Sequence, residues 1–195
     1  MNFHRVEQLR QAKKAAYEAE GTRLTYTAFI AKATVDTIRD FPLANASIDG
    51  ENVVYKRDIN LGVAVALDSG LLVPVIKDAA ERNMLGLCRA IQDLAHRART
   101  KQLKPEEVQG GTFTITNPGI FGAVFGLPII NQPQVAILGV GAIEKRVVVV
   151  DDMIAVRPMC YLSLGHDHRL IDGADAGRFL QALKDRLEQF DESCL

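Results

Sequence analysis

Several features are scarce in this sequence of 195 residues. Lysine and arginine total 23 against 24 acidic residues, giving a formal net charge of −1. That balance, without any basic tract, argues against an electrostatic nucleic-acid binder. No run of about eighteen apolar residues occurs, so no segment is predicted to span a membrane. The first residues are charged and polar, so no signal peptide is predicted either.

Cysteine is also scarce. Cys88, Cys160 and Cys194 are odd in number and widely spaced. This usage indicates a reducing compartment and predicts neither a disulfide framework nor a zinc site. We therefore expect a cytoplasmic location, or the mitochondrial matrix if the source is eukaryotic.

What is present is an ordinary globular composition, with 48% hydrophobic and 24% charged residues. A chain of this length can bury a proper core, and we expect a single domain over residues 1–195. Apolar residues recur at helical spacing in four segments. These predict helices over residues 1–20, 26–41, 85–103 and 174–190, with Thr25 capping the second.

Other segments have the period or the continuous apolar character of strands. Strands are predicted over residues 46–48, 53–55, 59–67, 71–76, 112–116, 135–140, 142–150 and 153–164. Asp49-Gly50 suits a type I′ turn, Asp68-Ser69-Gly70 is a further turn, and Pro74 marks an edge or a bulge in a buried strand. Four helices and about eight strands predict an α/β fold, a two-layer sandwich with helices packed on a mixed sheet.

The strongest candidate for chemistry lies where the last strand runs into the last helix. His168 can act as a base near neutral pH, and Asp172, four residues later, could orient it or position an arginine. A purely structural interpretation also fits, because Asp172 stands at the N-cap of the helix and Asp167-His168-Arg169 could be a solvated turn. The local pattern alone leaves both interpretations open.

A metal site is an alternative interpretation of the same stretch. His166 and His168 would lie on one face of a strand, an arrangement that binuclear hydrolases use. A catalytic zinc needs three protein ligands, and the other histidines, His4 and His96, fall in charged helices. We therefore predict no metal.

Thr116-Asn117 ends a strand before a glycine-rich loop. The pattern favours ordinary turn chemistry, with a hydroxyl donor aimed into a site as the functional alternative. The glycines that follow do not form a phosphate loop, because no Lys-Ser or Lys-Thr comes after them. Cys88 is interpreted as a core residue, and neither Cys160 nor Cys194 has a suitable base nearby in the sequence, so a thiol nucleophile is not predicted.

The segment from His168 to Gly173, His-x-x-x-Asp-Gly, resembles the active-site motif of the dihydrolipoamide acyltransferase cores of 2-oxo acid dehydrogenase complexes. Residues 111–117 are similar to the family's oxyanion segment, and residues 128–139 resemble its most recognisable core stretch. Residues 71–78 resemble its coenzyme A-side strand. The resemblance covers essentially the whole chain in order. It implies a fold like that of chloramphenicol acetyltransferase.

This resemblance implies a reversible acyl transfer between a dihydrolipoyl thiol and coenzyme A. His168 would be the general base, Thr116 would donate its hydroxyl to the oxyanion, and Asp172 would hold the turn through an ion pair. By the same resemblance, coenzyme A would contact residues that lie near or on the coenzyme-side strand, namely Asn117, Pro74, Lys77 and Asp78. The acyl group, succinyl or acetyl, is left open.

The resemblance also implies partners. The family's cores form trimers with the active site between neighbouring subunits, and the trimers assemble into cubic or larger cores. Lipoyl domains outside this chain would supply the lipoyl group, and the decarboxylase and dihydrolipoamide dehydrogenase components would be further partners. The polar C-terminus, residues 191–195, differs from the leucine-rich tail that is common in the family.

Two further departures from the family pattern leave alternatives open. The chain begins within what would be an internal helix, so its N-terminus is expected to be trimmed, and the lipoyl and subunit-binding domains are absent. An arginine from that segment would be the partner of Asp172, so an inactive assembly scaffold is one alternative. A chloramphenicol acetyltransferase-like enzyme is another. Gly165-His166 replaces the family's serine and aromatic residue, and His166 is expected to pack or hydrogen-bond near the site without being catalytic.

Overall fold

The computed structural model describes residues 1–68 and 70–195, so the predicted turn at Asp68-Ser69-Gly70 includes one residue, Ser69, outside the described part. All four predicted helices are confirmed. They are α1 (His4–Ala19), α2 (Tyr26–Asp40), α3 (Met84–Arg99) and α4 (Gly173–Glu188). Thr25 caps α2 as predicted, since its side chain accepts a hydrogen bond from the backbone N–H of Ala28. The helix predicted to reach residue 103 ends at Arg99. The described residues also contain five short 3₁₀ helices, at Pro42–Asn45, Ala79–Glu81, Pro105–Val108, Pro118–Phe121 and Glu192–Cys194.

The described residues contain eleven strands. They are β1 (Ala46–Asp49), β2 (Asn52–Tyr55), β3 (Leu61–Val63), β4 (Val65–Leu67), β5 (Gly70–Leu72), β6 (Val75–Ile76), β7 (Phe113–Thr116), β8 (Ala136–Val140), β9 (Glu144–Val150), β10 (Met153–Met159) and β11 (Leu162–His166). Five of them form the central sheet in the order β11-β8-β7-β3-β6. The neighbours β8, β7 and β3 run parallel, and both outer pairings are antiparallel. The predicted mixed sheet is therefore confirmed.

Three strand predictions were wrong in their extent. The single strand expected over residues 59–67 divides into β3, in the central sheet, and β4, which pairs with β5 in a separate hairpin. The buried strand expected over residues 71–76 breaks at Pro74, which has no N–H to donate, and Leu71 is 61% exposed. The strand expected over residues 153–164 is two strands, β10 and β11. The turn between β1 and β2 has a positive φ only at Gly50, so it is not type I′.

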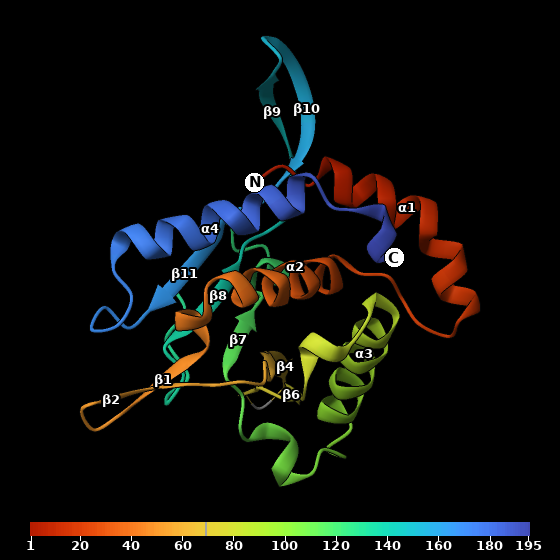
Figure 1. Ribbon diagram of the computed structural model, residues 1–195. Coiled ribbons are helices and arrows are strands. Elements are labelled where there is room, and N and C mark those ends of the chain that lie inside the picture. Colours follow the sequence, from red (N-terminus) through yellow and green to blue (C-terminus); the bar gives the residue numbers. More distant parts are fainter. Residues whose placement is uncertain (69) are drawn as a thin grey trace.

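The helices hold the sheet through aromatic contacts. Phe179 of α4 stacks on Phe113 of β7 at a ring-centroid distance of 5.9 Å, and Phe29 of α2 meets Phe190 edge-on at 4.9 Å. Figure 1 shows α2 and α4 lying side by side across the sheet, and both contribute to one continuous core. This packing holds α4, the helix that follows the turn carrying His168, against the sheet.

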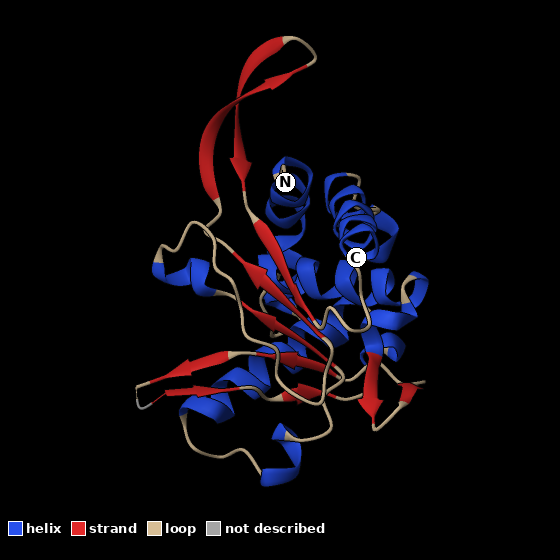
Figure 2. Ribbon diagram, turned by 90° about the vertical axis from the view of Figure 1, so that its left-hand side faces the viewer, coloured by secondary structure: helices blue, strands red, loops and turns tan. Residues whose placement is uncertain are grey.

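The β9–β10 hairpin stands apart from this core. It projects from the end of the sheet where β8 stops, as Figures 1 and 2 show. Residues Met1 to Phe3 pair with its base, since the Phe3 N–H donates to the carbonyl of Pro158 at 2.8 Å. None of the helices in the described part of the chain combines the length and the apolar character needed to cross a bilayer.

Candidate active site

The turn from Asp167 to Asp172, which we call the catalytic turn, is fixed at both ends. At its start, the Asp167 N–H donates to the carbonyl of Val135 at 2.8 Å, and the Asp167 carbonyl accepts from Leu170 and Ile171 at 3.0 Å each. At its end, the Asp172 carboxylate caps α4 by accepting from the Asp175 N–H at 2.7 Å. His168 lies between these anchors with an exposed side chain. The fold therefore presents an imidazole on a rigid backbone.

The capping hydrogen bond from the Asp175 backbone lowers the pKa of Asp172, and the charges of Arg178 and His168 act in the same direction. Within residues 1–68 and 70–195, the Asp172 carboxylate forms no ion pair. Arg178 instead pairs with Asp175 at 2.6 Å. The N-cap interpretation of Asp172 is thus confirmed, and its ion pair stays a prediction.

A second carboxylate stiffens the same turn. Asp167 receives the Arg169 guanidinium through Nη2 at 2.7 Å and through Nε at 3.0 Å, and it also accepts from the Arg169 backbone N–H. These bonds hold the pKa of Asp167 below its usual range. The side chains on both sides of His168, Asp167 and Arg169, therefore pair with each other and not with the imidazole.

Thr116 lies at the other end of the sheet. It pairs with Gly139 of β8, which pairs with Ser163 of β11, whereas His166 pairs with Ala136. The strand register separates the Thr116 and His166 backbones by roughly 10 Å along the strands and roughly 9.5 Å across them. His168 lies beyond His166, so one chain does not bring the Thr116 hydroxyl to the His168 ring.

The segment after Thr116, residues 118–135, crosses the sheet toward the His166 end. The carbonyl of Ala123 accepts from the Ala142 N–H at 2.8 Å, and the carbonyl of Gly126 accepts from the Ser163 hydroxyl at 2.5 Å. Gly141 lets the backbones approach, since a Cβ there would lie 2.0 Å from the Val124 carbonyl oxygen. These contacts hold the 118–135 segment against β8 and β11.

We expect Gly141→Ala to destabilise the fold by about 2 kcal/mol, because the new methyl group must push the 118–135 segment away from β8. Urea unfolding of the purified variant measures the loss. Gly177→Ala in α4 is the matched control, since no atom lies within 4 Å of its Cβ position; it should stabilise the helix by about 0.5 kcal/mol. Equal stability of the two variants would contradict the close approach.

The structure divides the four residues predicted to contact coenzyme A into two pairs. Pro74 and Asn117 lie at the Thr116 end, where the Pro74 carbonyl accepts from the Val63 N–H at 3.0 Å. Lys77 and Asp78 follow β6 at the opposite end. The ammonium of Lys77 donates to the Gln109 carbonyl, and Asp78 takes a left-handed conformation at φ 49°. An extended ligand running along β6 would be needed to contact all four.

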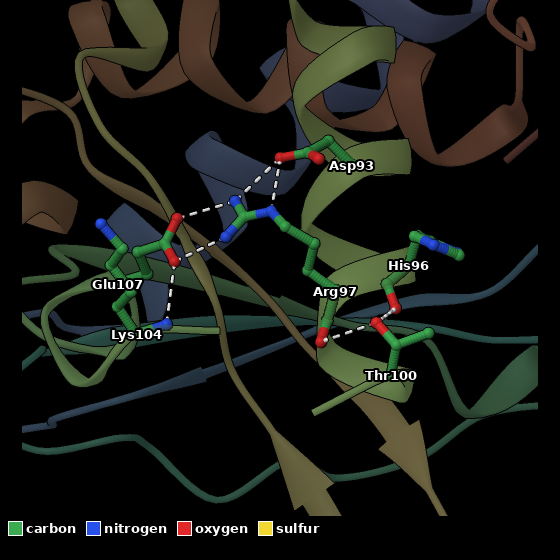
Figure 3. Close-up of polar contacts among 6 residues, drawn as sticks. All are labelled: Asp93, His96, Arg97, Thr100, Lys104 and Glu107. Carbon is green, nitrogen blue, oxygen red and sulfur yellow. Dashed lines mark hydrogen bonds and ion pairs between the residues drawn. The ribbon is translucent and has the colours of Figure 1, made fainter. Parts of the chain in front are cut away.

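Figure 3 shows that Arg97 joins α3 to the segment that precedes β7. Arg97 and Glu107 line the same pocket as Lys77. The Arg97 guanidinium binds Glu107 at 2.6 and 2.7 Å and Asp93 at 2.8 and 2.9 Å. Arg97 and the Lys104 backbone N–H lower the pKa of Glu107 to about 2. Because Gln109 lies two residues after Glu107, this network also supports the carbonyl that holds Lys77.

We expect Glu107→Gln to lower the free energy of unfolding by about 1 kcal/mol at pH 7, a value discounted for solvent screening. The folded pKa of Glu107 lies below its usual value of 4.5, so its contribution is complete above that pH and disappears as the pH falls toward 2. Urea unfolding from pH 7 to pH 3 should show the difference from the parent shrinking. The exposed neighbour Glu106→Gln is the control, and a pH-independent difference would contradict this origin.

The cysteines and the metal alternative can also be placed. Burial raises the pKa of the Cys88 and Cys160 thiols to about 11 each, which suits core residues better than nucleophiles. Residues 1–68 and 70–195 contain no cluster of three or more His, Cys, Asp or Glu side chains placed to hold a metal ion. The pair formed by His166 and His168, with ring centroids 5.4 Å apart, has no third ligand in that part of the chain.

One feature of the surface was not predicted from the sequence. The sequence predicts strands on both sides of the Asp151-Asp152 turn without indicating their exposure, and the β9–β10 hairpin exposes Val147, Val149, Ile154 and Val156. In the 118–135 segment, Leu127 is 85% and Ile129 is 91% exposed. The signal that could have revealed this was the run of four valines bordered by Asp151-Asp152, since so long a hairpin extends past the sheet it grows from.

The fold of this chain is similar to that of chloramphenicol acetyltransferase. A solved chloramphenicol acetyltransferase matches with a TM-score of 0.56 at 15% identity, over 92% of this chain and 82% of its own, which supports the fold alone. The family model for "2-oxoacid dehydrogenases acyltransferase (catalytic domain)" matches residues 1–195. The chain belongs to this family.

Individual relatives agree. The chain is 52% identical to the acetyltransferase component of the pyruvate dehydrogenase complex of Mycobacterium tuberculosis (strain CDC 1551 / Oshkosh), over 97% of this chain and 36% of that protein. It is 43% identical to the succinyltransferase component of the 2-oxoglutarate dehydrogenase complex of Bartonella vinsonii subsp. berkhoffii, over 92% and 44%. The chain thus spans less than half the length of these relatives.

Solved structures also match this chain over most of its length. A probable dihydrolipoamide acetyltransferase from Listeria monocytogenes 4b F2365 has a TM-score of 0.94 at 42% identity, covering 97% of this chain and 82% of that one. The cubic core of a pyruvate dehydrogenase multienzyme complex has a TM-score of 0.92 at 36% identity, covering 95% and 77%. The predicted family and fold are confirmed.

Proposed function

We propose that this chain transfers an acyl group reversibly between a dihydrolipoyl thiol and coenzyme A. The observation that carries the proposal is the exposed imidazole of His168 on the catalytic turn, in a chain that belongs to the acyltransferase family. A free thiol has a pKa of about 8.5, so it is mostly protonated at neutral pH and needs a base to become the nucleophile.

In the proposed reaction, His168 accepts the proton of the coenzyme A thiol as the sulfur attacks the acyl-lipoyl thioester carbon. The carbonyl oxygen becomes an oxyanion, and the Thr116 hydroxyl of a neighbouring copy donates a hydrogen bond to it. Collapse of the tetrahedral intermediate breaks the bond to the dihydrolipoyl sulfur. His168 then returns its proton to that sulfur, which leaves as a thiol, and acyl-coenzyme A is released.

A site shared between copies is supported by the strand register. Thr116 and His168 lie at opposite ends of one sheet, so each needs a second chain to meet the other residue. A head-to-tail interface that joins unlike ends closes into a ring when the rotation permits, and a homotrimer is such a ring. The proposal therefore includes a homotrimer with three equivalent sites.

The surface around Thr116 supports the same assembly. Val149 and Ile154 face each other across the β9–β10 hairpin, as do Val147 and Val156, so four exposed apolar side chains share one face. An isolated two-stranded hairpin is marginally stable in water, and a contiguous apolar patch marks an interaction surface. The hairpin rises from the Thr116 end of the sheet, where the second copy must approach.

Several finer points belong to the same proposal. The solved cubic core among the structural matches supports further assembly of trimers into a cubic or larger core. Lipoyl domains outside this chain would deliver the acyl group. The decarboxylase and dihydrolipoamide dehydrogenase components would be further partners, and the location would be the cytoplasm.

The acyl group is proposed from the relatives. Identity is higher to the acetyltransferase, at 52%, than to the succinyltransferase, at 43%, which favours an acetyl group.

The direct test is an acyl-transfer assay with dihydrolipoamide and either acetyl- or succinyl-coenzyme A, together with the mass of the particle by sedimentation. We expect turnover with a mass of three chains or a multiple of three. Assembled trimers without turnover would favour the scaffold alternative. Acylation of chloramphenicol in place of dihydrolipoamide would favour the chloramphenicol acetyltransferase-like alternative.

A further inference from the structure

His166 lies directly beneath the catalytic turn. Side chains alternate along β11, so His166 shares a face with Leu164, and Gly165 points the other way. A Cβ on Gly165 would lie 2.7 Å from the Pro128 carbonyl oxygen, so that face is covered by the 118–135 segment. Leu164 lines a cavity of about 200 Å³ with Ile171 and Phe179. The His166 ring therefore lies on the helix side of the sheet.

This position leaves a polar atom without a partner. The Nε2 atom of His166 is buried and has no hydrogen-bond partner among the described residues, and its Nδ1 atom is 3.5 Å from the Leu164 carbonyl oxygen. A buried, unpartnered ring nitrogen destabilises a fold, and a phenyl ring would occupy the same space without that penalty. Groups of this kind in native proteins call for a reason other than stability.

The neighbouring ring of His168 offers a reason for a histidine ring at position 166. The His166 and His168 centroids are 5.4 Å apart with their planes inclined at 40°, within the range of interacting aromatic pairs. His168 is exposed, and within residues 1–68 and 70–195 its ring has no hydrogen bond to hold it. An exposed imidazole turns freely about its two side-chain torsions, whereas a base must keep one nitrogen directed at the thiol proton.

We propose that His166 is a positioning residue: its ring forms a wall that holds the His168 imidazole in the orientation for proton transfer. The inference rests on the proposed function of His168 and adds to it the group that orients the base. The shape of the His166 ring carries this role, and its nitrogens do not take part in the proton transfer. A side chain with a ring and no nitrogen should therefore substitute for it.

Three variants separate shape from polarity. His166→Phe keeps the ring, His166→Gln keeps polar atoms without a ring, and His166→Ala removes both. We expect His166→Phe to retain at least a third of the parent kcat and to unfold at a higher temperature. His166→Ala and His166→Gln should each lose about tenfold in kcat, with KM for coenzyme A unchanged within twofold, because substrate binding is untouched. His96→Ala, on an exposed face of α3, is the control.

Crystal structures of the same variants give a readout independent of turnover. His168 should have one side-chain conformer in the parent and in His166→Phe, and more than one in His166→Ala. A His166→Phe variant as slow as His166→Ala would overturn the inference, as would parental kcat in His166→Ala. If the parent itself transfers no acyl group, the proposed function fails, while the conformers of His168 still decide whether His166 positions it.

Discussion

Replacing His168 with alanine is expected to lower kcat for coenzyme A-dependent acyl transfer by about a thousandfold, because the thiol loses the base that ionises it. The imidazole is exposed and makes no hydrogen bond within residues 1–68 and 70–195, so the substitution leaves no cavity and no orphaned partner. Folding and assembly should therefore be unchanged. The assay is the rate of transfer from acetyl- or succinyl-coenzyme A to dihydrolipoamide at saturating substrate.

The control for this variant must remove a histidine without touching the site. His96→Ala, in an exposed position of α3, serves this purpose and should keep the parental rate. A His168→Ala enzyme within threefold of the parent would show that another group deprotonates the thiol. Retained assembly in sedimentation would show that any loss of rate does not come from disassembly.

Replacing Thr116 with valine is expected to lower kcat by about a hundredfold, with KM for coenzyme A nearly unchanged. Valine has the shape of threonine and lacks the hydroxyl, so the variant removes one donor to the oxyanion while keeping the packing at the end of β7. Thr116 is half-buried, and none of the described residues forms a hydrogen bond with its hydroxyl, so the fold does not depend on it.

The Thr116→Ser variant tests whether the hydroxyl alone is sufficient. It keeps the hydroxyl and should retain most of the rate, whereas Thr116→Ala should resemble Thr116→Val. A valine variant with the parental kcat would mean that the oxyanion has another donor, or that Thr116 does not meet His168 in the assembled protein. Steady-state kinetics of the serine, alanine and valine variants, measured together, give this comparison.

The parts of the fold that could be predicted from sequence are those with strong local causes. The helices α2 and α4 carry long apolar faces, and Thr25 and Asp172 mark their starts through caps that depend only on neighbouring residues. The extent of the strands depends on distant partners. The alternating pattern of residues 59–67 does not reveal that the chain leaves the central sheet at Ala64 and joins another hairpin.

The candidate site also has a part that could be predicted from the sequence and a part that could not. The catalytic turn follows from a strand, a charged turn and an N-cap that are consecutive in sequence. The placement of Thr116 at the far end of the sheet follows from the register of three strands, which no local pattern encodes. The buried nitrogen of His166 was equally invisible, because it depends on how the turn folds back over β11. Tertiary register, rather than residue type, decides which candidates can act together.

The central claim is that each active site combines His168 from one chain with Thr116 from the next. Mixing His168→Ala and Thr116→Ala chains in equal amounts, by co-expression or by refolding together, tests this claim directly. A site is intact when a chain that keeps His168 meets a neighbour that keeps Thr116, so random assembly should restore about a quarter of the parental activity. A mixture no more active than the separate variants would contradict the shared site, because two inactive chains with self-contained sites cannot rescue each other.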